Sequence, residues 1–430
     1  MNLINKSCLG CLLSSKRKLL ILIIASILWV FIFSASLAQA NQNTLWFSNF
    51  SERVSLKRDG KQREVYHIPN GIDLKVSSQM LIKVEEKNDV DEILKKYSSV
   101  TNLVLVYEGF GFSYYRIKIS NTSQMQILID KLEKEKGVLL VQPDLLQLNS
   151  QKRVNRKTNE HFKVNDFREY LSQIGMVEKW RRTKGKGVKL AIIDDGFFMD
   201  HEDLQQTKII FSYDIEMQKL NARPKRKIDK HGTQVAGIIF SQHNSIGIDG
   251  IAPDSGLIAI RHSNTWTSDS LLAFNLARMS GADIINCSWL SPFLLEPLSD
   301  IVNDLAENGR NGKGVVIVFA AGNGGKSLQG GETEASMPNV ISVGALDENG
   351  NPLAFSNYGP MVQYYAYGAG FLTTSANGNF YSVFRGTSLA APILSGYTAL
   401  LLAENNTLTL SQVKKKLKKV FSLNQSEISK

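Results

Sequence analysis

Residues 188–196 read VKLAIIDDG, a run of aliphatic residues that ends in two carboxylates. Further apolar runs follow it, and stretches with helical spacing lie between them. The expected strands are 188–193, 257–260, 284–287, 315–320 and 340–343, and the expected helices lie near 231–240, 268–280, 297–307 and 387–404. Short, uninterrupted β-branched and aliphatic runs are typical of strands buried on both faces. The alternation therefore predicts an α/β fold with a mostly parallel central sheet and helices on both faces.

In such sheets the chemistry gathers beyond the carboxyl ends of the strands, where this sequence places Asp194, Ser288 and Asn323. The block HGTQVAG opens a helix with His231. The block GTSLAAP places Ser388 at a helix N-terminus, where free amide groups favour a developing negative charge. Each block alone also has a structural interpretation, since strand-ending acids bind ribose or metals and serine is a common helix cap.

Taken together in the order Asp, His, Ser, the blocks resemble the subtilisin-like serine protease (subtilase) family from about residue 166 to 417. The separations, 37 and 157 residues, are similar to the family pattern. The resemblance implies that Ser388 is the nucleophile, His231 the general base and Asp194 the residue that orients the imidazole. It also implies an oxyanion hole formed by the Asn323 amide and the Ser388 backbone N–H.

Several departures from the family pattern bear on specificity. Asp195 beside the catalytic aspartate is similar to kexin-like processing proteases, as are the blocks CSW at 287–289 and GNGG at 322–325, and it could favour a basic residue at P2. Val235 stands where those enzymes have a cysteine, so this likeness is local.

The segments expected to bind a polypeptide substrate flank the triad. Their candidate residues are Ser288, Trp289, Leu290 and Gly322. Backbone pairing along such an edge is blind to side-chain identity and suits a peptide. Leu290 stands where the family usually has a glycine that lines the S1 pocket, so its side chain would narrow or block the cleft.

An earlier segment, about 79–146, alternates strand, helix, strand, strand, helix, strand, which predicts a small α+β ferredoxin-like unit. Its helices are expected at 89–97 and 123–135. Its position before the peptidase-like region resembles the inhibitory prodomain of the same family, whose last strand runs into a tail that occupies the active site before maturation. A domain that recruits substrate is the alternative.

The N-terminus carries a targeting pattern: residues 16–18 are basic, residues 19–40 carry no charge, and the stretch ends in Ala-Gln-Ala. This predicts a signal peptide cleaved after Ala40 and a secreted or periplasmic protein, with an uncleaved membrane anchor as the alternative. The predicted organisation is 1–40 signal peptide, 41–150 prodomain, 151–165 linker with the maturation cleavage, and 166–430 peptidase domain.

Composition and charge exclude other classes. The 430 residues are 43 % hydrophobic and 21 % charged, as in folded globular proteins. The net charge of +10 is uneven: residues 1–165 carry 24 basic and 15 acidic side chains (+9), and residues 166–430 carry 26 and 25 (+1). Because the larger part is nearly neutral, no nucleic-acid partner is expected.

The three cysteines are expected to form no intrachain disulfide, because Cys8 and Cys11 precede the predicted signal cleavage and Cys287 is then alone. Cys287 is interpreted as a small buried hydrophobe. No cysteine and histidine cluster has metal-ligand spacing. A nucleotide-binding α/β protein is disfavoured because the sequence has no G-x-G-x-x-G motif after the first strand and no P-loop.

The sequence therefore predicts an exported serine endopeptidase that is made as a self-processing zymogen. The alternative is an inhibited or non-catalytic subtilase relative that acts as a peptide-binding module. The expected partners are polypeptide substrates and the protein's own prodomain, and a monomer is expected. No cofactor is expected to be required, with Ca²⁺ left open because loop ligands have no fixed spacing.

Overall fold

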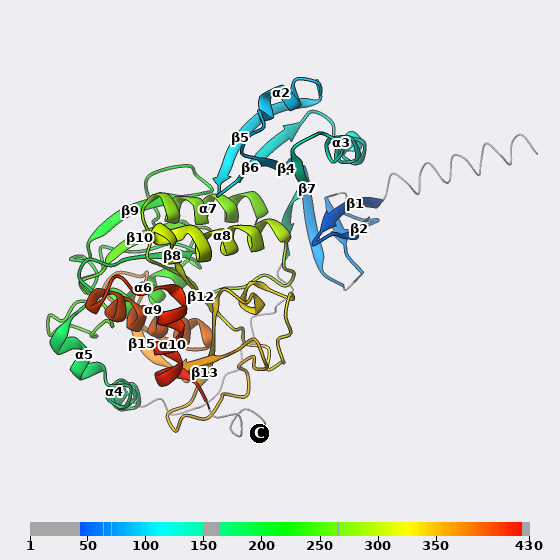
Figure 1. Cartoon of the computed structure of the whole chain (residues 1–430). Coiled ribbons are helices and arrows are strands. Elements are labelled where there is room, and N and C mark those ends of the chain that lie inside the picture. The colour runs from blue at the N-terminus through cyan, green and yellow to red at the C-terminus, as the bar shows by residue number, and fades with distance from the viewer. Residues whose placement is uncertain (1–43, 63, 70, 149–163, 265, 424–430) are drawn as a thin grey trace, which may run out of the picture.

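The structure is a computed structural model that describes residues 44–423 except 63, 70, 149–163 and 265. The predicted signal peptide, Cys8, Cys11 and most of the predicted linker lie outside the described residues. Figure 1 shows two parts, a smaller N-terminal sheet in blue and cyan and a larger body from green to red. Among the described residues, no helix has the length and apolar character needed to cross a membrane.

The larger body is built on a seven-stranded sheet of parallel strand pairs in the order β14-β13-β12-β11-β8-β10-β9. Its strands are β8 (Lys189–Asp194), β9 (Ile209–Asp214), β10 (Gly256–Arg261), β11 (Ile284–Cys287), β12 (Val316–Ala320), β13 (Ile341–Leu346) and β14 (Tyr364–Tyr367). Leu190 and Ile192 of β8 enter one hydrophobic core, while Ala191 and Ile193 enter another. The sheet is therefore buried on both faces, which confirms the predicted α/β fold.

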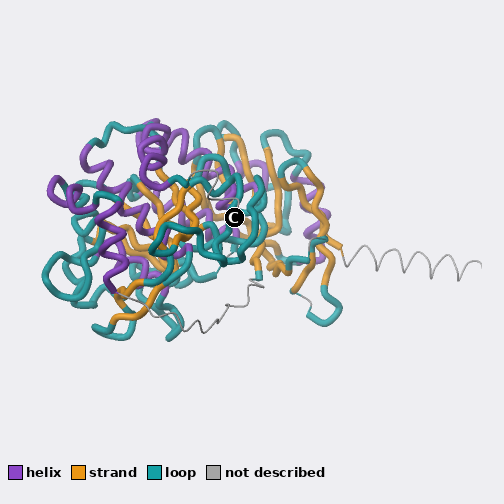
Figure 2. Tube along the Cα trace, turned by 90° about the horizontal axis from the view of Figure 1, so that it is seen from below, coloured by secondary structure: helices purple, strands orange, loops and turns teal. Residues whose placement is uncertain are grey.

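Helices cover both faces of this sheet, as Figure 2 shows with strands inside and helices outside. The helices are α4 (Val164–Gln173), α5 (Met176–Arg182), α6 (His231–Phe240), α7 (Thr267–Met279), α8 (Glu296–Gly312), α9 (Thr387–Glu404) and α10 (Leu410–Phe421), with the short η2 (Glu334–Ser336) and the hairpin β15 (Phe371–Thr374) and β16 (Tyr381–Phe384). Residues of α6, α9 and α10 pack in the same hydrophobic core as Leu190. Residues of α7 and α8 pack in the other core, with Ala191.

The structure adds elements that the sequence pattern did not predict. Strands β9 and β14 lie at the two edges of the sheet, where an apolar run is not required because one side lacks a neighbour. Residues 164–165, expected in the linker, belong to α4. The predicted bounds of α6 and α9 agree with the structure.

The N-terminal part is an antiparallel sheet in the order β1-β2-β3-β4-β6-β5, with β7 paired to β4. Its elements are β1 (Thr44–Asn49), β2 (Glu52–Arg58), β3 (Val65–His67), β4 (Asp73–Glu85), α2 (Val90–Leu94), β5 (Val100–Glu108), β6 (Phe112–Ile119), η1 (Thr122–Gln124), α3 (Met125–Leu132) and β7 (Val138–Gln147). The β4-to-β7 portion has the predicted order of strands and helices. Strands β1 to β3 were not predicted, and both helices are shorter than expected.

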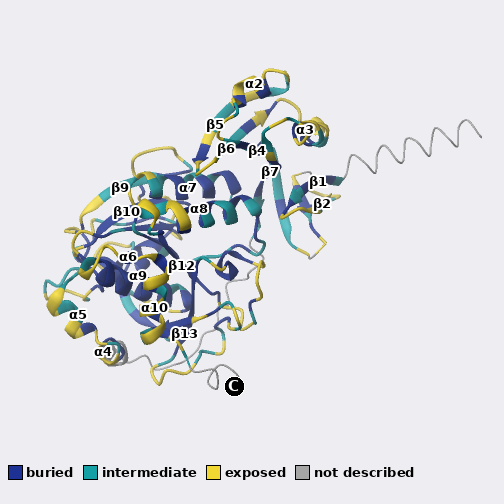
Figure 3. Ribbon diagram, in the orientation of Figure 1, coloured by how far each residue is buried: buried dark blue, intermediate teal, exposed yellow. Residues whose placement is uncertain are grey.

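The two parts pack together along α7 and α8, where Figure 3 shows buried residues on both sides of the contact. Tyr107 and Tyr114 of the N-terminal sheet lie in the same hydrophobic core as residues of these two helices. In the other direction, Leu295, which precedes α8, lies in the core of the N-terminal sheet. Each part thus buries large apolar side chains in a core of the other part. Such burial is strongly favourable, so the contact stabilises the packing of the two parts.

Candidate active site

Asp194 and His231 meet at the carboxyl end of β8. His231 begins α6, and its Nδ1 lies 2.9 Å from Oδ1 and 3.0 Å from Oδ2 of Asp194. The Asp194 side chain is 4 % exposed and that of His231 is 33 % exposed. A buried carboxylate at Nδ1 favours the tautomer that carries its proton there, which leaves Nε2 to act as a base.

Close packing of α6 on β8 depends on the glycine after the histidine. A Cβ atom at Gly232 would lie 2.6 Å from the Gly196 carbonyl oxygen and 3.0 Å from the Asp194 Cβ. Only glycine therefore lets His231 approach Asp194 this closely.

Ser388 is the second residue of α9, which follows Gly386 at a φ of 99°. Its Oγ donates a hydrogen bond to the Ser288 carbonyl oxygen (3.0 Å), and the Ser288 Oγ donates to the Ser388 carbonyl oxygen (3.2 Å). The two predicted site residues therefore hold each other directly, and the segment after β11 is fixed to the start of α9.

A buried polar network supports this contact and was not found from the sequence. Asn286 of β11 donates from Nδ2 to the Ser288 Oγ (3.0 Å), and its Oδ1 accepts from the Ser395 Oγ (2.8 Å). Asn286 and Ser395 are both fully buried. A polar residue inside an apolar strand, and another inside an apolar helix, is the signal that could have identified them, because buried polar groups are normally paired.

Asn323 follows β12 and reaches the start of α9. Its Oδ1 accepts hydrogen bonds from the backbone N–H and the Oγ1 of Thr387 (2.9 and 3.0 Å). Buried Asn357 shapes the loop by accepting from the Gly324 N–H and donating to the Ala321 carbonyl oxygen. Thr387 and Asn357 were not selected from the sequence, since their role depends on contacts between distant segments.

The segment 288–290, which follows β11, lies beside Gly322, which follows β12. The Trp289 Nε1 donates to the Ile193 carbonyl oxygen (2.7 Å), which ties this segment to the end of β8. Leu290 has its Cδ2 2.8 Å from the position of a Cβ at Gly322, where φ is 100°. Leu290 thus fills the space beside Gly322.

Cys287 is fully buried at the end of β11. Burial raises the pKa of its thiol well above the ordinary value. A thiol that stays protonated is a poor nucleophile, so the environment fits the interpretation of Cys287 as a small buried hydrophobe.

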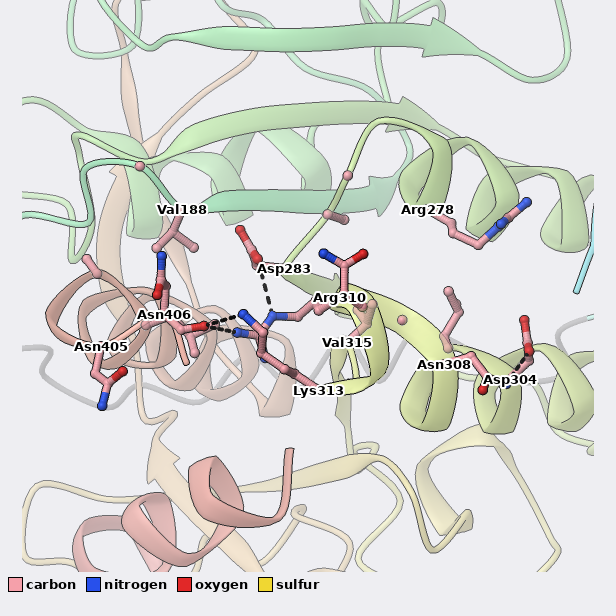
Figure 4. A pocket seen from close by; sticks show the side chains of 18 of the residues that line it. Val188, Arg278, Asp283, Asp304, Asn308, Arg310, Lys313, Val315, Asn405 and Asn406 are labelled. Atoms are coloured by element: carbon pink, nitrogen blue, oxygen red, sulfur yellow. Dashed lines mark hydrogen bonds and ion pairs between the residues drawn. The ribbon is translucent and has the colours of Figure 1, made fainter. Parts of the chain in front are cut away.

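A cavity of about 910 Å³ lies away from these residues, between the N-terminal sheet, α8 and the end of α9 (Figure 4). Arg310 projects beside it and donates hydrogen bonds to the Asp283 carboxylate and to three backbone carbonyl oxygens. None of the lining residues is a predicted site residue. This cavity therefore contributes nothing to the candidate active site.

The residue order, the parallel sheet and this geometry agree with one family. Residues 185–426, more than half of the chain, match the domain described as the Subtilase family. The chain belongs to the subtilase family. The resemblance predicted from the three motif blocks is thereby confirmed.

Several curated proteins are similar to this subtilase. The calcium-dependent protease of Trichormus variabilis is 30 % identical over 392 residues, 80 % of this chain and 58 % of that protein. The thermophilic serine proteinase of Bacillus sp. AK1 is 38 % identical over 231 residues (52 % and 55 %), and subtilisin DY of Bacillus licheniformis is 33 % identical over 242 residues (54 % and 83 %). The chain spans about 58 % of the length of the calcium-dependent proteases that it matches.

Among solved structures, the subtilase resembles fervidolysin from Fervidobacterium pennivorans, described as a keratinolytic enzyme related to subtilisin. The TM-score is 0.61 at 23 % identity, over 79 % of this chain and 57 % of that one. A protease from Pseudoalteromonas arctica gives a TM-score of 0.51 at 23 % identity, over 59 % of this chain and 90 % of that one. These similarities support the fold.

Proposed function

We propose that this subtilase is an exported serine endopeptidase that hydrolyses peptide bonds through an acyl-enzyme and is made as a self-processing zymogen. One observation carries the proposal: the Asp194 carboxylate holds His231 Nδ1 at the carboxyl end of the parallel strands, where Ser388, the second residue of α9, contacts the segment after β11. A buried acid, an oriented imidazole and a serine at a helix N-terminus are the groups that acyl transfer needs.

The steps follow from these positions. The Ser388 Oγ turns from the Ser288 carbonyl toward His231, gives its proton to Nε2 and forms a bond to the substrate carbonyl carbon. The oxyanion accepts hydrogen bonds from the Asn323 Nδ2 and the Ser388 N–H. The imidazolium then protonates the amine nitrogen as the scissile C–N bond breaks, which leaves the acyl-enzyme, while Asp194 stays ionised. Water then attacks the acyl-enzyme and gives a proton to His231. The imidazolium returns that proton to the Ser388 Oγ as the ester bond breaks, which releases the acid and restores Ser388.

A peptide segment of the chain itself pairs with two segments that follow strands of the central sheet. The end of β7 enters between two segments that follow β10 and β11: Leu146 forms an antiparallel bridge with Trp266, and the Gln147 side chain exchanges hydrogen bonds with the backbone N–H and carbonyl of Phe293 (2.9 and 2.7 Å). Backbone pairing of this kind supports a polypeptide as the substrate class.

The N-terminal part makes charged and aromatic contacts with α8. Asp300 of α8 accepts from Lys83 (2.7 Å) and from the Tyr114 hydroxyl, and Asp304 accepts from the Tyr107 hydroxyl (2.6 Å). These charged and aromatic groups are largely removed from water at the interface. Such pairing supports the proposal that residues 41–150 form a prodomain that docks on α7 and α8.

The N-terminal part also caps both helices of the interface. Neither α7 nor α8 has a side-chain cap from its own N-cap residue. Asp144 accepts from the backbone N–H and the Oγ of Ser268 (2.9 and 2.7 Å), and Asn49 accepts from the Glu296 N–H (2.8 Å). The first turns of both helices thus rely on the proposed prodomain, which supports a role in folding as well as in inhibition.

A peptide-binding module without catalysis is the second candidate. It is favoured by Leu290, which fills space beside Gly322, and by the Ser388 Oγ, which donates its hydrogen bond to the Ser288 carbonyl oxygen (3.0 Å). A covalent phosphonate probe separates the two candidates, because labelling of Ser388 needs an activated serine and an accessible oxyanion hole.

Two relatives are named calcium-dependent proteases, so calcium needs a test. Within the described ranges, no three or more His, Cys, Asp or Glu side chains converge as a metal site. The side chains therefore do not define a set of metal ligands, and the catalytic steps above use no metal ion. The prediction that hydrolysis needs no cofactor is tested by assaying turnover after chelation, while thermal unfolding with and without Ca²⁺ tests a structural role.

The decisive experiment compares the intact masses of the exported wild type and Ser388→Ala, expressed identically. Loss of a segment ending in the 145–165 region from the wild type alone supports self-processing by Ser388. A new N-terminus at residue 41 supports signal cleavage after Ala40, and gel filtration tests the expected monomer. If both proteins retain the segment and neither reacts with the phosphonate, the peptidase proposal is wrong.

A further inference from the structure

Asp195, the second carboxylate of the opening motif, contacts the backbone at the start of α6. Its Oδ2 accepts from the His231 N–H (3.1 Å), and its Oδ1 accepts from the Gly232 N–H (2.8 Å). The N-cap residue of α6, Lys230, provides no side-chain cap of its own. The first two amides of this helix, which have no partner within the helix, are therefore satisfied from the end of β8.

We propose that Asp195 is a positioning residue for catalysis: it caps the helix that carries His231 and fixes the imidazole against Asp194. This inference rests on the proposed peptidase function, since it concerns the same histidine. It assigns Asp195 a role different from the recognition of a basic P2 residue that the sequence suggested.

The contacts form a closed arrangement around one residue. The Asp194 carboxylate holds the His231 ring, the Asp195 carboxylate holds the His231 backbone, and the Asp195 N–H donates to Asp194 Oδ1 (2.8 Å). A residue held at both its ring and its backbone cannot pivot without breaking several hydrogen bonds. Catalysis is sensitive to displacements of about 1 Å, so this restraint bears on turnover.

The negative charge of Asp195 also favours the role of His231 as a base. Burial, and then the neighbouring Asp194, raise the pKa of Asp195 to about 6, while His231 and the two backbone hydrogen bonds oppose the rise. Because the coupling is mutual, an ionised Asp195 stabilises the imidazolium that forms when His231 accepts a proton. Nearby Lys225 and Arg226, in the loop before α6, face Asp214 and Asp229.

The test compares three variants of the full chain after processing. Asp195→Ala removes the cap and the charge, and Asp195→Asn removes the charge but keeps one acceptor. Asp200→Ala is the matched control, because Asp200 is an exposed acid a few residues further along the same loop, where it pairs with Arg223. The readouts are kcat and KM between pH 5 and 9, on peptides that differ only in lysine or alanine at P2.

We expect Asp195→Ala to lower kcat about 2- to 30-fold, the range that loss of a helix cap implies, with KM changed less than about twofold on both peptides. We expect Asp195→Asn to lose less kcat than Asp195→Ala on the plateau of the pH profile, but to shift the acid limb of that profile to lower pH. When Asp195→Asn is combined with Ser388→Ala, NMR titration of the His231 ring should show the same shift to lower pH, although this double variant has no turnover.

Three results overturn the inference. A rise in KM for the lysine peptide alone makes Asp195 a subsite residue. If the Asp195 variants have a lower melting temperature but an unchanged kcat, acid limb of the kcat profile and His231 ring titration, Asp195 is a structural helix cap only. If they differ from the wild type no more than Asp200→Ala does, Asp195 has no role in catalysis or stability. If Asp195→Ala does not fold, Asp195→Asn decides. A wild type without turnover or labelling overturns the proposed function itself, which is a distinguishable failure.

Discussion

The side-chain oxygen of Asn323 accepts two hydrogen bonds from Thr387, one from its backbone N–H (2.9 Å) and one from its Oγ1 (3.0 Å). Thr387 directly precedes Ser388, so the Asn323 amide is fixed relative to the proposed nucleophile. With Oδ1 held in this way, Nδ2 is the group that can donate to an oxyanion beside Ser388.

Replacement of Asn323 by Ala should lower kcat about 100- to 1,000-fold, because one preorganised donor to the oxyanion is lost. KM should change little, since the bond forms in the transition state and not with the bound ground state. Steady-state kinetics on a peptide substrate measure both constants. Thr387→Val removes the Oγ1 that donates to Asn323 Oδ1 and accepts from the Gly322 N–H, but it keeps the backbone N–H bond to Asn323 and should give a smaller loss of kcat. An equal loss in both variants would instead indicate disruption of the loop.

Leu290→Gly should open the space beside Gly322 and favour large P1 residues. A cavity in an apolar pocket accepts bulkier groups, so the kcat/KM ratio for P1 phenylalanine over P1 alanine should rise at least about tenfold. Profiling with a library of peptides that differ at P1 makes the measurement, and Leu290→Met, which keeps the volume, is the control. An unchanged P1 profile in Leu290→Gly would show that Leu290 does not line the P1 site.

Removal of either helix cap contributed by the N-terminal part should weaken its docking. Asn49→Ala and Asp144→Ala each lose an N-cap, which corresponds to about 0.5–2 kcal/mol and to a roughly 2- to 30-fold faster release after cleavage. The rate of release is followed by gel filtration of the cleaved complex and by the rise of activity. Asn121→Ala is the control, because Asn121 caps η1 within the N-terminal part; an equal effect there would contradict the prediction.

Docking of the N-terminal part should weaken as pH rises from about 4 to 7. Burial, and then the neighbouring Asp144, raise the pKa of Asp269 to about 7, and burial also raises the pKa of Asp144. Asp269 pairs with Arg116 across the interface (3.1 Å). When the parts separate, its pKa should return toward the ordinary value near 4, so the docked state binds the extra proton and is favoured at low pH.

The dissociation constant of the cleaved complex, measured from pH 5 to 8, tests this sign. We expect release to be faster at pH 8 than at pH 5 and the pH dependence to flatten in Asp269→Asn. Tighter docking at high pH in the wild type would contradict the assignment.

Much of the sheet and the order of the candidate site followed from the sequence. Residues 188–196 determine a strand buried on both faces, because Leu190 and Ile192 enter one core and Ala191 and Ile193 the other. A parallel sheet brings the carboxyl ends of its strands to one edge, so local runs were enough to place Asp194, Ser288 and Asn323 together. Edge strands such as β9 were not predictable in this way, since half of their environment lacks a sheet neighbour.

The contacts that tune the site were decided by the tertiary structure alone. Asn49 caps α8 across 247 positions of sequence, and Leu290 reaches Gly322 only because β11 and β12 are neighbours in the sheet. Asp195 adjoins Asp194 in the chain, yet its carboxylate serves a helix that begins 36 residues later. Local sequence determines which residues form strands and helices, whereas a helix end takes its cap from whichever polar group the packed chain brings within hydrogen-bond distance.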